Sequence, residues 1–340
     1  MNSTVQHGGT DALGAPAHDF STNANALGPC PSALLAIAQA DASRYPDPTG
    51  TRLKAALGAF HGVAPDRVLL LASASEGIQR FSAWAARSPG SLGATAWLPP
   101  HHYGDLARAA DAWGLVRTNE PGRARLLWSC EPSAPLGQAE AGLADRVNAL
   151  RPDQALVLDQ AYAPLRLQGE PTLSGTTLDR VWRLVSPNKA LGLTGVRGAY
   201  AIAPLAAREA MAGLEALAPS WPLGAHAEAM LMAWTQPATQ QWLQDSLNTL
   251  REWKAQQTAL CESLGWTVLP SEANHFVARL PDPHDVERLN TLRREHGVKL
   301  RDCASFGLPG HVRLGVRSPA DQEALRAAWP RTGGGDNAAR

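Results

Sequence analysis

The sequence predicts an α/β protein with a large domain built on a mostly parallel sheet and a smaller α+β domain. Its 340 residues, 44% of them hydrophobic, are enough for about two packed domains. Predicted strands alternate with helices along the middle of the chain, and several of these strands lack polar alternation. Such strands are buried on both faces, as in a parallel sheet covered by helices.

The elements can be followed in order from the N-terminus. The first 28 residues are rich in glycine, asparagine and serine, which favours an extended arm or loop. Helices are expected after Pro31 and after residue 50, separated by a loop with two prolines and a glycine. Ser75 is expected to cap the next helix. Strands of the large domain are expected at residues 67–72, 94–98, 126–129, 155–158, 181–185 and 198–202.

Beyond about Pro222 the pattern becomes helical, and a smaller α+β unit follows. Its strands are expected at residues 275–280, 298–301 and 311–316, and its helices at 286–296 and 320–329. The predicted domains are 1–45, an N-terminal arm with part of the small domain, 46–245, the large domain, and 246–330, the small C-terminal domain. Residues 331–340 are expected to be a disordered tail.

Composition excludes several classes of function. Charged residues make up 18% of the chain and the net charge is +0, which gives a nucleic-acid partner little support. The 4 cysteines form no CxxC pair, which argues against a metal site or a disulfide scaffold. The polar N-terminus and the lack of a long apolar run predict a soluble, cytoplasmic protein that does not enter membranes.

The most informative segment runs from Ser186 to Gly198. A single lysine, Lys189, follows a predicted strand, and glycines and Arg197 come shortly after it. A lysine in a confined site can form a Schiff base with an aldehyde. Arg197 and Ser186 can bind a phosphate, and the glycines allow the backbone to approach a cofactor closely. The alternative is a surface lysine in a glycine-rich loop.

Two further elements accompany this lysine. Asp159 ends a buried strand, where ligands bind in open α/β sheets, and its carboxylate can keep a pyridine nitrogen protonated. Tyr162 can hydrogen-bond a ring hydroxyl. Taken alone, Asp159 is equally consistent with a strand-end cap. Residues 72–78 form a strand–turn–helix start, whose backbone N–H groups can bind an anion.

The order of these elements resembles that of fold-type I, class I/II enzymes that use pyridoxal 5′-phosphate (PLP). The motifs are the small-residue turn at 72–78, Asp159-x-Ala-Tyr162, and Ser186-x-x-Lys189-x-x-Gly-Leu-x-Gly-x-Arg197. The resemblance implies the PLP-dependent transferase fold, with PLP bound by the large domain. It is greatest toward histidinol-phosphate aminotransferases and the threonine-phosphate decarboxylases of cobalamin biosynthesis. Residues 7–9, 19–29 and 301–308 are similar to the decarboxylases, and 44–48 to both groups.

The resemblance also implies a role for each matching residue. Lys189 is the Schiff-base lysine and proton shuttle, Asp159 pairs with the pyridine nitrogen, and Tyr162 contacts the ring hydroxyl. Tyr103 stacks on the cofactor, or His102 does so instead. The cofactor phosphate is held by Ala74, Ser75, Ser186 and Arg197, together with Tyr45 of the other subunit, which implies a homodimer with shared active sites.

The substrate would be a small amino acid or amino phosphate. The resemblance implies that Arg313 binds its carboxylate, while His7, Asn23 and Arg301 grip its far end, including a phosphate. One position departs from the family. Ala134 stands where an asparagine usually contacts the ring oxygen, so Tyr162 would hold that oxygen with less help.

The resemblance leaves the reaction open between three functions. The first is a lyase that decarboxylates L-threonine O-3-phosphate to aminopropanol phosphate in cobalamin biosynthesis, which the N-terminal arm and residues 301–308 favour. The alternative is an aminotransferase acting on histidinol phosphate or a related amino acid, which would use the same cofactor residues. A non-catalytic regulator is suggested only by Ala134, and the retained Lys189, Asp159 and Arg197 weigh against it.

Overall fold

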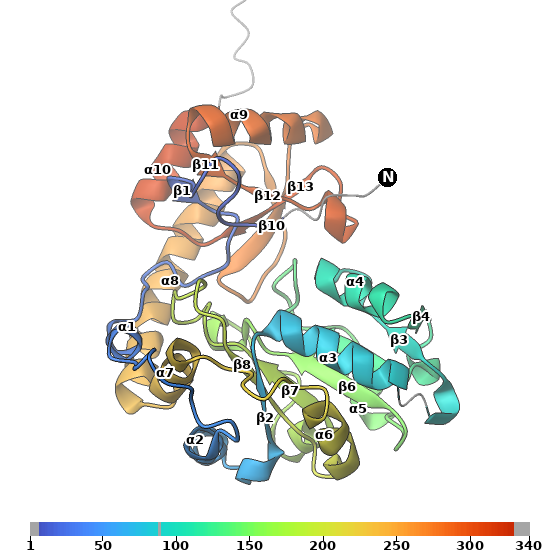
Figure 1. Cartoon of the computed structure of the whole chain (residues 1–340). Coiled ribbons are helices and arrows are strands. Elements are labelled where there is room, and N and C mark those ends of the chain that lie inside the picture. Colours follow the sequence, from blue (N-terminus) through green and yellow to red (C-terminus); the bar gives the residue numbers. More distant parts are fainter. Residues whose placement is uncertain (1–6, 88–89, 330–340) are drawn as a thin grey trace, which may run out of the picture.

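A computed structural model describes residues 7–87 and 90–329; the predicted tail at 331–340 lies outside these ranges. The large domain is built on a seven-stranded sheet of order β2-β8-β7-β6-β5-β3-β4 (Figure 1). Only β8 runs against its neighbours, so the expected mostly parallel sheet is confirmed. The strands are β2 (Val68–Leu71), β3 (Thr95–Trp97), β4 (Val116–Arg117), β5 (Leu126–Cys130), β6 (Ala155–Asp159), β7 (Trp182–Val185) and β8 (Ala199–Ile202).

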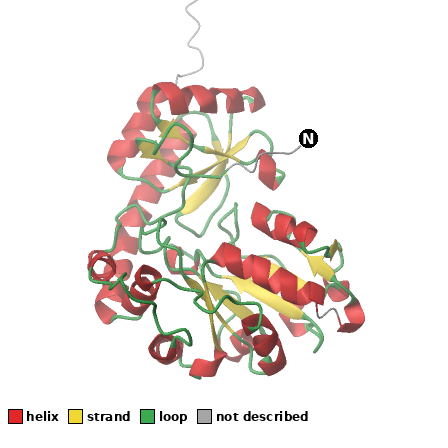
Figure 2. Cartoon of the chain, viewed as in Figure 1, coloured by secondary structure: helices red, strands yellow, loops and turns green. Residues whose placement is uncertain are grey.

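Helices cover both faces of this sheet, which is why its strands are apolar throughout (Figure 2). On β2, Leu69 and Leu71 pack into one cluster with Phe81 of α3, while Val68 and Leu70 pack into another with helices of the opposite face. The covering helices are α1 (Pro31–Ala38), α2 (Thr51–His61), α3 (Ala74–Arg87), α4 (Gly104–Ala112), α5 (Leu143–Asn148), α6 (Arg208–Glu215) and α7 (Ala225–Trp234).

The start of α3 differs from the expectation. The Glu76 backbone N–H donates to the Ser73 hydroxyl at 3.0 Å, so Ser73 caps the helix. Ser75 lies within the first turn instead. Because β2 ends at Leu71 and α3 begins at Ala74, Ser73 is the residue directly before the helix, where a capping side chain must lie.

The small domain holds a four-stranded antiparallel sheet of order β12-β13-β10-β9. A pair of parallel strands, β1 and β11, joins the N-terminal arm to it, and the arm residue Phe20 is fully buried in its core. The strands are β1 (His18–Asp19), β9 (Thr267–Val268), β10 (His275–Arg279), β11 (Val298–Lys299), β12 (Arg301–Asp302) and β13 (His311–Gly315); the helices are α9 (Arg288–Glu295) and α10 (Pro319–Ala328).

The single strand expected at 298–301 is therefore wrong. Its first half pairs with the arm as β11, and its second half enters the other sheet as β12, because each half finds a different partner strand. Helix α8 (Pro237–Ser263) connects the domains: Leu243 and Leu247 lie in the large-domain core, while Leu260 lies in the small-domain core (Figure 1). The predicted boundary near residue 245 thus falls within one continuous helix.

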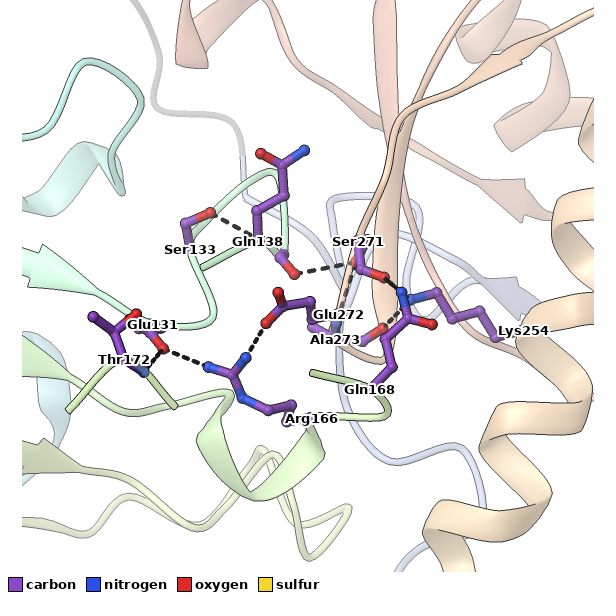
Figure 3. A network of polar contacts seen from close by, with 11 residues as sticks. Glu131, Ser133, Gln138, Arg166, Gln168, Thr172, Lys254, Ser271, Glu272 and Ala273 are labelled. Carbon is purple, nitrogen blue, oxygen red and sulfur yellow. Dashed lines mark hydrogen bonds and ion pairs between the residues drawn. The ribbon is translucent and has the colours of Figure 1, made fainter. Parts of the chain in front are cut away.

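A polar network also links the two domains (Figure 3). Arg166 bonds Glu131, which follows β5, at 2.7 Å, and it bonds Glu272, which precedes β10. From α8, Lys254 donates to the carbonyl oxygen of Ala273 at 2.8 Å. Within the described residues, no helix combines the length and apolarity needed to cross a bilayer.

Candidate active site

The predicted cofactor residues gather at one edge of the large sheet. Strands β2, β6 and β7 run in the same direction, so their carboxyl ends lie at the same edge. Asp159 ends β6, and Ser186 and Lys189 follow β7. The Lys189 ammonium nitrogen lies 5.1 Å from the centroid of the Tyr162 ring. The structure therefore brings together the lysine, the carboxylate and the tyrosine that the sequence singled out.

The turn that carries Lys189 is fixed by the N-terminal arm. The Asn25 backbone N–H donates to the Lys189 carbonyl at 2.9 Å. Gly192 has φ +66, and a Cβ there would lie 2.7 Å from Gly28 Cα. Glycine is needed at 192 for both reasons. Its close neighbour in this structure is the arm, whereas the sequence suggested a cofactor.

Asp159 lies in an environment that disfavours its charge. Burial raises the pKa of its carboxyl, while the Lys189 ammonium and the Ala161 N–H, at 2.9 Å, act in the opposite direction. Asp159 forms no ion pair with any described residue. A buried carboxylate of this kind is stabilised by a cationic ligand.

The residues predicted to hold the cofactor phosphate divide into a group at the strand edge and an exposed group. Ala74 and Ser75 lie in the first turn of α3, and the buried Ser186 hydroxyl has no hydrogen-bond partner among the described residues. Arg197 is exposed and borders a surface hollow of about 390 Å³. Tyr45 is 78% exposed, and its ring stacks on that of Trp221 with 4.5 Å between the centroids.

Tyr103, and not His102, has side-chain contacts toward the site. Its hydroxyl interacts with Ser75 and with Asp105, and burial raises its pKa to about 12. The His102 ring instead bonds the Pro99 carbonyl oxygen at 2.8 Å, within its own loop. His7 lies 6.2 Å from the Tyr103 ring.

The two predicted substrate arginines are directly opposite each other on β12 and β13. Both are buried, and both lie against the Phe306 ring, Arg301 at 5.0 Å and Arg313 at 5.7 Å. Burial, followed by the charge of Arg313, lowers the pKa of Arg301. Arg313 donates to the Ser21 carbonyl oxygen at 2.9 Å, and its Nε has no described partner. Two buried like charges of this kind are a candidate site for an anion.

Two other buried side chains lack partners near these arginines. Both amide atoms of Asn23 are buried with no hydrogen bond to a described residue, and Asn23 was predicted as a substrate contact. His275 was not predicted. Its ring centroid lies 4.6 Å from that of Tyr162, and neither ring nitrogen forms a hydrogen bond of ordinary geometry with a described residue. No local sequence signal marks His275, because its place beside Tyr162 depends on how the two domains meet.

These observations fit PLP, the cofactor that the motifs implied. Asp159 lacks the cation that a pyridinium nitrogen would supply, and Tyr162 stands beside the lysine that would bind the aldehyde. The unpartnered Ser186 hydroxyl and the start of α3 suit a phosphate.

Comparison with known sequences agrees with this geometry. Residues 111–329 match the model of the family described as aminotransferase class I and II. A histidinol-phosphate aminotransferase of Ruegeria pomeroyi is 29% identical over 331 residues, covering 90% of this chain and 88% of that protein. An aromatic amino acid aminotransferase of Thermobifida fusca is 29% identical over 328 residues, with 90% and 88% covered.

Solved structures share the fold. A histidinol-phosphate aminotransferase from Sinorhizobium meliloti in complex with PLP superposes with a TM-score of 0.80 at 22% identity, covering 96% of this chain and 95% of that chain. An L-threonine-O-3-phosphate decarboxylase from Porphyromonas gingivalis gives 0.67 at 20% identity, with 87% and 90% covered. The chain therefore belongs to the class I and II aminotransferase family, whose cofactor is pyridoxal 5′-phosphate.

Proposed function

We propose that this protein is an aminotransferase for a phosphorylated amino substrate of the histidinol phosphate type. The observation that carries the proposal is the pair Arg301 and Arg313, buried and directly opposite on adjacent strands. Like charges in this position destabilise a sheet, and a bound anion offsets that cost through charge-assisted hydrogen bonds. Histidinol-phosphate aminotransferases among the relatives support the same substrate class.

Each site residue has a role in this proposal. PLP, when bound, supplies an electron sink for the bonds of the substrate's Cα. Asp159 keeps the pyridine nitrogen protonated, and Tyr162 holds the ring oxygen. Lys189 binds the cofactor and then moves the Cα proton with its amine. Arg301, Arg313 and Asn23 orient the substrate and the keto acid that accepts the amino group.

Decarboxylation of L-threonine O-3-phosphate is a second candidate, because that one small molecule carries both a phosphate and a carboxylate. Each of the two arginines would then take one anionic group. Histidinol phosphate has no carboxylate, so in the first proposal the carboxylate contacts serve the keto acid. The decarboxylase of Porphyromonas gingivalis among the structural neighbours shares the fold.

One pair of assays separates the candidates. The purified, PLP-loaded protein is incubated with histidinol phosphate and 2-oxoglutarate, and glutamate is followed. A parallel reaction receives L-threonine O-3-phosphate, and CO2 is followed. Glutamate without CO2 is the expected result, whereas CO2 without need of a keto acid would replace the first proposal by the second. Lys189→Ala is the control and should lose either activity; a wild-type protein inactive in both assays would refute both candidates.

We also propose a cytoplasmic homodimer with shared sites. Tyr45 and Trp221 form an exposed aromatic pair, and Arg197 is exposed on the same chain, although all three residues would be expected to contact a ligand or a partner. Sedimentation should give twice the chain mass, and Tyr45→Ser should weaken PLP binding. A monomer that binds PLP normally would contradict the shared site.

A further inference from the structure

His275 is a buried polar side chain that the roles above leave unexplained. It begins β10, it is fully buried, and neither ring nitrogen has a partner of ordinary hydrogen-bond geometry among the described residues, although the Ser133 backbone is close enough to act on its pKa as a hydrogen-bonding group. A buried polar group without a partner is costly, so such a group is usually completed by a ligand or by water. The position of the ring therefore indicates what it binds.

The neighbours of His275 place it at the cofactor side of the site. Its ring is tilted by 56° against the Tyr162 ring, with 4.6 Å between the centroids. Tyr162 is itself buried in a small cluster with Ala134 and Ala161, whose side chains cannot form hydrogen bonds. Among the contacts that the structure describes around Tyr162, His275 thus supplies a neutral hydrogen-bonding side chain beside Lys189.

The surroundings also keep the His275 ring neutral. Burial is the main cause that lowers its pKa well below the usual value, and the charges of Arg313, Lys254 and Lys189 act in the same direction. A hydrogen-bonding contact with the Ser133 backbone acts in the opposite direction. A neutral imidazole has one donor nitrogen and one acceptor nitrogen, so it can donate to an oxygen without adding a charge.

We propose that His275 is a cofactor-binding residue that shares the ring oxygen of PLP with Tyr162. In this chain the imidazole would supply the hydrogen bond that Ala134, which has no polar side-chain atom, cannot form. The inference rests on the proposed placement of the cofactor over Asp159 and Tyr162, and it goes beyond it by assigning a third side chain to the ring.

The test is the pH titration of the visible absorption band of the lysine-bound cofactor, together with the dissociation constant of PLP. His275→Phe keeps a ring of similar shape and removes both nitrogens. With fewer hydrogen bonds, the ring oxygen holds the proton that it shares with the lysine-derived nitrogen more strongly. The pKa at which the visible band changes should therefore rise by about 1 unit, a tenfold change. PLP should bind about two- to tenfold more weakly. His275→Gln restores a donor and should return both values toward wild type.

The matched control is His61→Phe. His61 is half-buried, and its ring bonds the hydroxyl of Tyr200, which lies in the core of the large domain, at 2.7 Å. This variant should keep the wild-type band pKa even where its melting temperature falls. If His275→Phe is not recovered folded, His275→Leu is measured in its place with the same expected shift.

The outcomes separate this inference from the placement of the cofactor. A folded His275 variant with the wild-type band pKa and PLP affinity would overturn the role of His275 alone, provided that Lys189→Ala loses the band. If Lys189→Ala retains the band, the placement itself fails and His275 loses its role with it. A shift of equal size in His61→Phe would show a general effect of lost stability and would also overturn the inference.

Discussion

Removal of the Arg166 guanidinium should destabilise the protein strongly, because Arg166 links the two domains from a buried position (Figure 3). Its side chain is 9% exposed, and it bonds Glu131, which is 4% exposed, and Glu272, which is 25% exposed. In Arg166→Met the two carboxylates lose their common cation. Breaking a buried pair costs about 3–5 kcal/mol, and the partial exposure of Glu272 favours the lower end.

The cost depends on pH in a defined direction. In the variant, Glu131 is buried without its cation, and binding a proton removes the cost of burying that charge. The folded variant then binds more protons than the unfolded chain, and its deficit in stability shrinks as the pH falls from 7 toward 5. With an unfolding entropy of about 2.1 cal/mol/K per residue, a loss of about 3 kcal/mol lowers the melting temperature of this 340-residue chain by about 4 °C.

Calorimetry at pH 7 and pH 5 measures both effects. The double variant Arg166→Met/Glu131→Gln should recover part of the loss, since the buried charge is removed. Arg326→Met is the control, because Arg326 and its partner Glu323 are 58% and 69% exposed. It should change stability by less than about 1 kcal/mol. An Arg166→Met protein as stable as this control, or with a deficit that does not depend on pH, would refute the reasoning.

Three further changes test the site and the domain contact. Arg313→Gln should raise KM for anionic substrates more than it lowers kcat, by about tenfold or more, since a charged hydrogen bond is worth about 1.5–3 kcal/mol; unchanged steady-state kinetics would remove Arg313 from the site. Tyr103→Ala should weaken PLP binding in an absorbance titration while His102→Ala does not, because only Tyr103 interacts with Ser75; the reverse order would assign the stacking ring to His102. Burial lowers the pKa of Lys254 to about 8, below its unfolded value, so above pH 8 the unfolded chain binds more protons than the folded one. The free energy of unfolding, measured by urea denaturation, should therefore rise by up to about 3 kcal/mol between pH 8 and 10. Lys254→Met should lack this rise, and an equal rise in both proteins would exclude Lys254 as its source.

The sequence by itself determined the large sheet and the centre of the site. Continuous apolar strands such as Ala155–Asp159 are recognised locally. A residue that directly follows a strand, as Lys189 follows β7, must lie at the carboxyl edge of a parallel sheet. Lys189, Asp159 and Tyr162 could therefore be grouped before any contact was known, because topology alone brings consecutive parallel strand ends together.

Only the tertiary structure decided the features that depend on distant partners. It split residues 298–301 between two sheets, placed Arg301 opposite Arg313, and buried His275 against Tyr162. Register between antiparallel strands and the packing of one domain on another are set by residues far apart in the chain, and no local pattern encodes them. The alternation of strands and helices thus determined where a cofactor binds, while long-range packing decided which side chains surround it.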